Sequence, residues 1–203
     1  GHCSVIYDCL RLLNFKILGF IDKSLPTGFE KSKGFECLGN DNYLINNTKH
    51  ENKNVFLVNG IGSTIKTDLR KNIYNHFVNL GYAFIQIVHP NAFVSNNVML
   101  SSDCQIMSGA NIQPEVNIGK NVLINTGSNI DHGSKIKNHV HIAPGVTISG
   151  NVVIGTGTHI GTSVTIVQNI KIGENCFIGA GVTVLKDVPP NTFISPKENL
   201  VWK

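Results

Sequence analysis

The chain lacks several features that mark common classes of protein. None of its 203 residues belong to an apolar run long enough to cross a membrane, and no secretory signal pattern is present. Only 15% of the residues are charged, the net charge is +4, and the Lys and Arg residues are scattered rather than gathered into a basic patch. We therefore expect a cytoplasmic protein with no membrane insertion and no nucleic-acid partner.

The cysteines exclude a disulfide framework and give no sign of a metal site. They are odd in number and lack the close spacing of metal ligands: Cys3, Cys9, Cys37, Cys104 and Cys176. This usage is typical of a reducing compartment, where at least Cys104 and Cys176 are predicted to be small core residues.

A sixfold repeat dominates the second half of the sequence. Every sixth residue is aliphatic, without insertion or deletion, at Val94, Leu100, Ile106, Ile112, Ile118, Ile124, Ile130, Ile136, Ile142, Ile148, Ile154, Ile160, Ile166, Ile172, Ile178 and Val184. A period of six fits neither a helix nor an alternating strand. One repeat cannot bury its own apolar side chain, so the repeats must stack. The pattern predicts a β-solenoid of short strands joined by tight turns.

A second stripe supports the same period. Two residues before the aliphatic positions lie small or β-branched residues, among them Val98, Cys104, Ala110, Val116, Val122, Ser128, Ser134, Val140, Val146, Val152, Thr158 and Val164. One such residue beside each Ile suits a narrow, densely packed core. Five glycines directly follow an aliphatic position, where we expect the turn to need backbone freedom: Gly119, Gly155, Gly161, Gly173 and Gly179.

Residues 1–88 lack this period and predict a separate α/β domain, followed by a solenoid domain over residues 89–203. Helices are expected at 4–14, with an apolar face of Val5, Cys9, Leu12 and Leu13, and at 63–80, with Ser63 as N-cap and Gly81 as the stop. Strands are expected at 16–22, 54–58 and 84–88. Helices alternating with strands imply a small parallel sheet. The polar stretch 23–53 reads as surface loop with at most one short helix.

Residues 125–150 resemble one family closely. The stretch NTGSNIDH, residues 125–132, is followed nine residues later by HIAPG, residues 141–145. Both segments resemble the hexapeptide-repeat acetyltransferases, in the branch of the sialic acid O-acetyltransferases and bacillosamine-pathway sugar N-acetyltransferases. The resemblance implies a left-handed parallel β-helix of about five coils, with three hexads to a coil, behind a small Rossmann-like domain.

The resemblance makes His132 the catalytic base, since acetyl transfer needs an acceptor that loses a proton and imidazole takes one near neutral pH. Asp131 could orient its ring. Relatives often carry an acidic residue directly after this His, where the present chain has Gly133, and Glu115, about one coil below, is a weaker candidate for that role.

The resemblance also implies acetyl-CoA as co-substrate and a homotrimer with sites between subunits. The donor would contact His141, Ser149, Gly150, Thr162, Ala180, Pro196 and Lys197, with the Gly150 N–H stabilising the oxyanion. His159, eighteen residues after His141, should stack above it.

Acceptor binding is expected in the first domain, where a glycine-rich loop before a helix can bind phosphate. The candidates are Gly1, His2, Asp22, Lys23, Asn59, Gly60, Ile61 and Gly62, with Asn125 from the repeat domain. Relatives begin with one further strand, and we expect residues upstream of Gly1 to complete this domain.

The predicted function is transfer of acetyl from acetyl-CoA to the amine of a nucleotide-linked amino-sugar, by direct attack, in bacterial surface-glycan synthesis. O-acetylation of a sialic or related nonulosonic acid is the alternative within enzymes. A non-catalytic β-helix scaffold is the alternative of another class. A zinc site of the hexapeptide carbonic anhydrase type lacks its companion residues, so no metal is expected.

Overall fold

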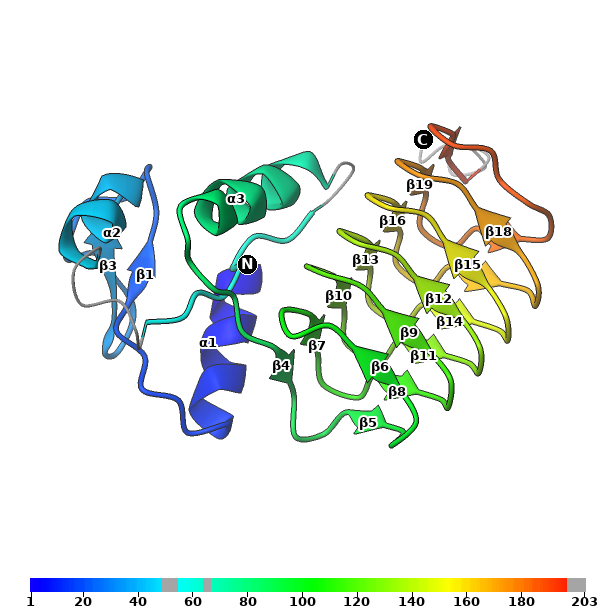
Figure 1. Ribbon diagram of the computed structural model, residues 1–203, viewed down its shortest axis with the longest axis horizontal. Helices are drawn as coiled ribbons and strands as arrows, with labels where there is room; N and C mark the ends of the chain where they lie inside the picture. Colours follow the sequence, from blue (N-terminus) through cyan, green and yellow to red (C-terminus); the bar gives the residue numbers. More distant parts are fainter. Residues whose placement is uncertain (49–54, 64–66, 197–203) are drawn as a thin grey trace, which may run out of the picture.

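The computed structural model describes residues 1–48, 55–63 and 67–196, and places a small α/β domain beside a triangular β-helix (Figure 1). The β-helix has three parallel sheets, which we call faces 1, 2 and 3. Face 1 holds β4 (Ile87–Val88), β7 (Gln105–Ile106), β10 (Leu123–Ile124), β13 (His141–Ile142), β16 (His159–Ile160), β19 (Phe177–Ile178) and β21 (Phe193–Ile194). Face 2 holds β5 (Phe93–Val94), β8 (Asn111–Ile112), β11 (Asn129–Ile130), β14 (Thr147–Ile148), β17 (Thr165–Ile166) and β20 (Thr183–Val184). Face 3 holds β6 (Met99–Leu100), β9 (Asn117–Ile118), β12 (Lys135–Ile136), β15 (Val153–Ile154) and β18 (Lys171–Ile172).

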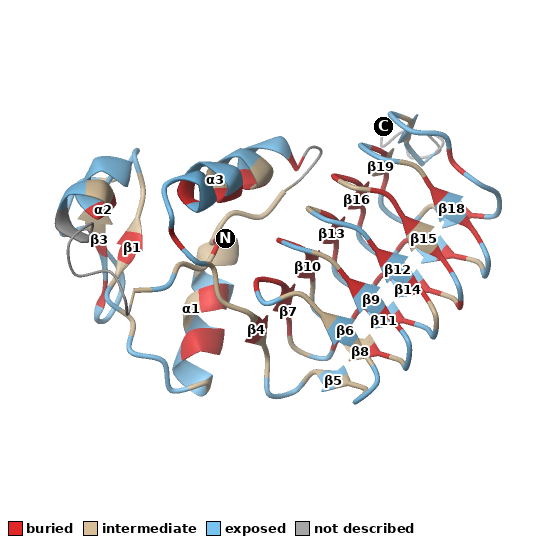
Figure 2. Cartoon of the chain, viewed as in Figure 1, coloured by how far each residue is buried: buried red, intermediate tan, exposed pale blue. Residues whose placement is uncertain are grey.

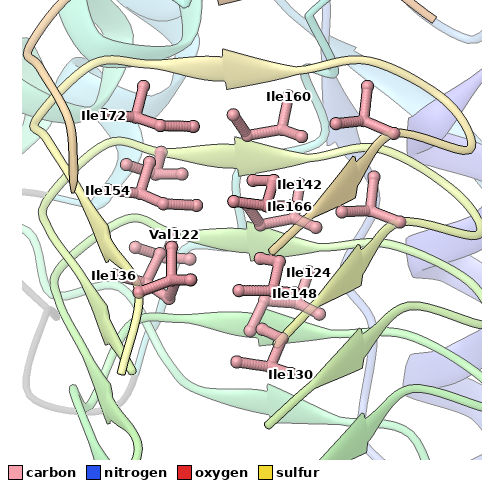
Figure 3. Packing of buried hydrophobic residues seen from close by; sticks show 14 of the residues in the cluster. Val122, Ile124, Ile130, Ile136, Ile142, Ile148, Ile154, Ile160, Ile166 and Ile172 are labelled. Carbon is pink, nitrogen blue, oxygen red and sulfur yellow. The ribbon is translucent and has the colours of Figure 1, made fainter. Parts of the chain in front are cut away.

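The predicted hexad stack forms the core of this β-helix. Paired residues on neighbouring coils are eighteen apart, as in Ile124 with Ile142 and Ile130 with Ile148. Both aliphatic stripes point inward and are almost entirely buried between Cys104 and Val188, as Figure 3 shows for ten of them. Full burial of one such side chain is worth about 1.5–3 kcal/mol, so the stack is the main source of stability in this domain.

The repeat begins one hexad earlier than the sequence pattern predicts. Val88 lies six residues before Val94, and β4 pairs with β7 on face 1. The predicted strand 84–88 is therefore wrong as a single element, because Phe84 bridges to Leu57 while Ile87 and Val88 belong to the β-helix. The strand expected at 54–58 is reduced to that one bridge, and Asn54 lies outside the described residues.

The first domain is an α/β unit, as predicted. Its elements are α1 (His2–Leu12), β1 (Phe20–Ile21), β2 (Glu30–Ser32), β3 (Phe35–Gly39), α2 (Asp41–Thr48) and α3 (Asp68–Asn79). β1 and β3 are parallel, and β2 adds antiparallel to β3. The expectation of surface loop with at most one short helix over 23–53 is wrong in part: α2 is the one helix among the described residues of this stretch, but β2 and β3 are strands. The alternation of buried Phe35, Cys37 and Gly39 with exposed or half-buried neighbours makes β3 a strand.

The packing of α1 also differs in detail from the prediction. Its buried residues are Ile6, Cys9 and Leu10, whereas Val5 and Leu12 are 45% and 53% exposed. This buried set has the i, i+3, i+4 spacing of one helix face. Together with Ile87, Met107 and Leu123 it forms one apolar cluster, so α1 packs against face 1 of the β-helix (Figure 2).

Polar groups also hold α3 against the segment around residue 60 within the first domain. The side chain of Arg70 is 1% exposed, and its Nη1 donates to the carbonyl oxygens of Asn59 at 3.1 Å and Ile61 at 2.7 Å. Burial lowers the pKa of Arg70 to about 9.

α3 begins at Asp68, five residues later than predicted, with Thr67 as N-cap. The predicted stop at Gly81 has a φ of +89°.

Ser63 is not a helix cap but a contact to the β-helix. Its Oγ lies 2.5 Å from Nδ1 of His141 and 3.1 Å from Nδ1 of His159. The two rings meet edge to face with centroids 4.8 Å apart, and each side chain is 4% exposed. Burial, together with the charges of His159, Arg70 and His2, lowers the pKa of His141 to about 2. Burial also lowers the pKa of His159, to about 4.

The glycines that follow the aliphatic positions are explained by close approach of neighbouring coils, which corrects the sequence-based reason. None of the five has a positive φ. A Cβ on Gly155 would lie 2.5 Å from the backbone of Gly173, whereas nothing lies within 4 Å of a Cβ on Gly181, whose φ is +71°.

We predict that Gly155→Ala lowers the free energy of unfolding by about 3 kcal/mol, as overpacking does. Gly181→Ala should cost about 1 kcal/mol, from φ strain alone. Chemical denaturation measures both, and equal losses would contradict the packing explanation.

The buried histidines predict a loss of stability in acid. Unfolded, His141 and His159 take up protons near pH 6.5. Folded, they stay neutral to about pH 2 and about pH 4 respectively. The unfolded state therefore binds more protons in this window. The free energy of unfolding, undiminished above pH 6.5, should fall as the pH drops toward 4, by up to about 1.4 kcal/mol per pH unit and histidine. His159→Phe should flatten this slope in denaturation curves at pH 7.5, 6 and 5, and an unchanged slope would contradict the assignment.

Candidate functional site

His132 lies on an exposed turn between β11 and β12, at the edge that joins faces 2 and 3. Gly150 occupies the same place on the next coil. A Cβ on Gly150 would meet the ring of His132, at 2.7 Å from Cε1 and 2.8 Å from Nε2. Gly150 has no positive φ, so the ring and not the backbone conformation requires a glycine there. The imidazole of His132 therefore lies across the backbone of Gly150.

The backbone N–H of Gly150 is available beside this ring. Its neighbours in the chain are engaged in the coil ladder, Ser149 N–H with the carbonyl of Ile166 and Asn151 N–H with the carbonyl of His132. Within the described part of the chain, the N–H of Gly150 donates to no group. A base and a free N–H side by side form the pair that an acyl transfer needs.

The carboxylate of Asp131 holds the turn rather than the ring. Its Oδ1 accepts a hydrogen bond from the backbone N–H of His132 at 3.0 Å. Between residues 67 and 196, no carboxylate is hydrogen-bonded to the His132 ring. Gly133 has a φ of +68°, and a Cβ there would lie 2.3 Å from Oδ1 of Asn151. Both facts favour glycine at position 133. Glu115 is exposed on the turn between β8 and β9, at the same edge one coil below.

The residues predicted to bind acetyl-CoA are distributed over several parts of one chain. Ser149 and Gly150 share the edge with His132. Thr162 and Ala180 are exposed on the turns after β16 and β19, at the edge between faces 1 and 2, and Asn125 follows β10 at that same edge. His141 is buried on face 1, and Pro196 is exposed after β21. Lys197 lies outside the described residues.

The predicted acceptor loops of the first domain do meet. A Cβ on Gly60 would lie 3.3 Å from Cβ and Sγ of Cys3, and one on Gly62 would lie 3.4 Å from Cβ of His2. The segment around residue 60 thus packs closely against the start of α1, next to the exposed Gly1. Asn59 is buried inside this arrangement, with Nδ2 donating to the Arg70 carbonyl at 3.0 Å and Oδ1 accepting from the N–H of Ile61 at 3.1 Å.

Asp22 and Lys23 follow β1. Oδ1 of Asp22 accepts from the N–H of Ser24 at 2.8 Å and from its hydroxyl at 2.6 Å, and these bonds lower the pKa of Asp22. Burial raises the pKa of the Cys3 thiol, and the charge of Asp22 acts in the same direction. Asp22 is therefore an ionised carboxylate near the start of α1, and Lys23 beside it is exposed.

Three residues at the domain junction were missed by sequence reasoning: Ser63, Arg70 and Gln105. Oε1 of Gln105 lies 3.0 Å from Nε2 of His2, and its Nε2 donates to the Asn59 carbonyl at 3.0 Å. Gln105 was detectable, because it occupies the same outward row as His141 and His159. The positions of Ser63 and Arg70 depend on how the domains pack, and no sequence pattern marks them.

Two family models match separate parts of the chain. The PglD N-terminal domain matches residues 1–77, and the bacterial transferase hexapeptide (six repeats) matches residues 115–150 and 151–186. A comparison with curated proteins found no match.

Solved structures match the whole length of the chain. The acetyltransferase domain of PglB from Neisseria gonorrhoeae FA1090, in complex with acetyl coenzyme A, has 26% identity and a TM-score of 0.87, over 97% of this chain and 92% of that one. A histidine variant of perosamine N-acetyltransferase from Caulobacter crescentus, in complex with CoA and GDP-perosamine, has 24% identity and a TM-score of 0.88, over 100% and 93%. WeeI from Acinetobacter baumannii AYE has 17% identity and a TM-score of 0.65, over 96% and 90%.

These matches agree with the architecture described above, in which a small α/β domain precedes a left-handed β-helix. The chain belongs to the hexapeptide-repeat sugar acetyltransferases that carry a PglD-type N-terminal domain.

Proposed function

We propose that the protein transfers acetyl from acetyl-CoA to the amine of a nucleotide-linked amino-sugar, in bacterial surface-glycan synthesis. The observation that carries this proposal is the pairing of the exposed His132 with the free N–H of Gly150, which is buried beside the His132 ring. The PglB domain and the perosamine enzyme, whose structures hold acetyl coenzyme A or CoA with GDP-perosamine, support the donor and the acceptor class.

The geometry supports direct attack. As the acceptor amine bonds to the thioester carbon, His132 takes one of its protons. The carbonyl oxygen becomes an oxyanion, which the N–H of Gly150 stabilises. The carbon–sulfur bond then breaks, and the CoA thiolate leaves and is protonated by the imidazolium. A covalent cysteine intermediate is disfavoured, since Cys104 and Cys176 are buried and burial raises the pKa of Cys104 to about 12.

A homotrimer would complete the site. His132 is exposed on one edge of the β-helix, while Thr162 and Ala180 are exposed on another. An edge of one copy placed against a different edge of the next would bring these residues together in a closed ring. On this account, His132 of one subunit works with donor and acceptor groups of its neighbour.

O-acetylation of a nonulosonic acid is less well supported. A neutral hydroxyl is a weaker nucleophile than a neutral amine, so its attack depends more strongly on the base. Between residues 67 and 196, no carboxylate is hydrogen-bonded to the His132 ring to strengthen that base. A non-catalytic scaffold gives no reason for glycine at position 150, where any side chain would collide with the His132 ring.

We predict that His132→Ala lowers kcat by roughly a hundredfold or more, as expected on removal of a general base. Release of the CoA thiol would be followed with UDP-, dTDP- and GDP-linked 4-amino-sugars and with sialic acid. His76→Ala, at an exposed histidine of α3, is the matched control and should retain activity. Activity that survives in His132→Ala would exclude this base, and a folded wild type that releases no thiol with any acceptor would favour the scaffold.

A second prediction concerns Gly150. In Gly150→Ala the methyl group takes the space of the His132 ring, so the imidazole must turn away. We expect kcat to fall by about tenfold or more, as misplacement of a catalytic group causes, with little change in the KM for acetyl-CoA. Wild-type kcat in a folded Gly150→Ala protein would show that the ring does not work from this position.

A further inference from the structure

Face 1 of the β-helix carries a row of outward side chains, one from each strand, in register. From the first coil upward they are Ile87, Gln105, Leu123, His141, His159, Phe177 and Phe193. The apolar members Ile87 and Leu123 pack against α1. The polar members Gln105, His141 and His159, which we call the polar row, contact residues 59–63 and His2 instead.

Gln105 joins both acceptor loops. The Asn59 carbonyl can only accept a hydrogen bond, so the amide nitrogen of Gln105 must face it and the amide oxygen must face His2. His2 therefore donates from Nε2. Burial lowers the pKa of His2 to about 4, so the ring is neutral at pH 7 and its Nδ1 carries a lone pair. A ligand group that meets Nδ1 of His2 must be a hydrogen-bond donor.

The two histidines fix the other end of the segment. Ser63 has one hydroxyl proton, and each neutral imidazole has one N–H. Ser63 can therefore donate to Nδ1 of one ring only, so at least one ring donates from Nδ1 to the Ser63 hydroxyl oxygen. Nε2 of His141 is buried without a partner. Since an orphaned acceptor costs less than an orphaned N–H, His141 donates to Ser63. The Ser63 proton has no other acceptor among the described residues, so it is donated to His159.

On its other side the segment is held by α3. Arg70 donates to the carbonyls of Asn59 and Ile61, and its own carbonyl accepts from Asn59. Residues 59–63 thus lie between Arg70 and the polar row, with hydrogen bonds at both ends of the segment.

We propose that Gln105 and His159, with His141, are positioning residues for the acceptor substrate: they hold residues 59–63 and His2 in the arrangement that binds the nucleotide-linked sugar. The proposal rests on the function proposed above. In this proposal the β-helix contributes to acceptor recognition through Gln105, His141 and His159 on face 1, in addition to the residues on its edges. His2 then accepts from a hydroxyl or N–H of the substrate rather than contacting a phosphate oxygen.

The test uses Gln105→Leu and His159→Phe in the full chain. Leucine matches Leu123 in the row, and phenylalanine extends the stack of His159 on Phe177, so both should fold. Asn117→Leu is the matched control, because Asn117 is the exposed outward residue of face 3 in the coil of Gln105. His159→Asn, whose side chain can replace Nδ1, is the rescue variant.

Two readouts are independent. Hydrogen–deuterium exchange of the free protein should show faster exchange in residues 55–63 for both variants and not for Asn117→Leu, and this holds whether or not the acceptor has been identified. With the amino-sugar nucleotide that the acceptor panel selects, KM should rise about tenfold, while kcat and the KM for acetyl-CoA stay within twofold. His159→Asn should recover most of both effects.

Unchanged exchange in residues 55–63 would overturn the proposal. Faster exchange with an unchanged KM for the acceptor would also overturn it, because the segment would then be held for the fold alone. A wild type that acetylates no acceptor would contradict the proposed function instead, and the contacts of the polar row would still be judged by exchange.

Discussion

The stacking of coils at intervals of eighteen residues is the constraint on which the rest of the structure depends. It buries one aliphatic residue per hexad in the core, and it also fixes which residues meet on the outside. Gly150 lies above His132 and His159 lies above His141 because each pair is separated by one coil. The same register leaves no room for a Cβ between Gly155 and Gly173, so the spacing that stabilises the core also restricts the turns.

The two domains contact each other through face 1 of the β-helix, which is partly apolar and partly polar. The apolar part, where α1 meets Ile87 and Leu123, supplies the burial that holds the domains together. The polar part is costly to bury unless every group is paired. Gln105 and Ser63 pair groups of face 1 with residues 59–63, although Nε2 of His141 and two nitrogens of Arg70 have no partner among the described residues, and this pairing favours one arrangement of the acceptor loops.

Much of the fold followed from the sequence, because a strict period acts through local packing alone. The β-helix, its inward stripes and the proximity of Gly150 to His132 could all be predicted in this way. Less was predictable in the first domain. β3 lies within the polar stretch 23–53, which was expected to be mainly surface loop, and Ser63 was predicted to be a helix N-cap. The role of Ser63 depends on His141 and His159, far away in sequence, and no local pattern reports such contacts. The assignment of Thr162 and Ala180 to the donor site needs a second subunit, which the sequence of one chain cannot place.

The central claim is that acetyl transfer takes place at the edge formed by His132 and Gly150. A crystal structure of the protein with CoA tests it most directly. The account predicts that the CoA sulfur lies about 3–4 Å from the His132 ring, as a near-attack arrangement requires, with the N–H of Gly150 directed at the place of the acetyl oxygen. A CoA molecule bound with its sulfur at another edge of the β-helix, away from every copy of His132, would contradict it.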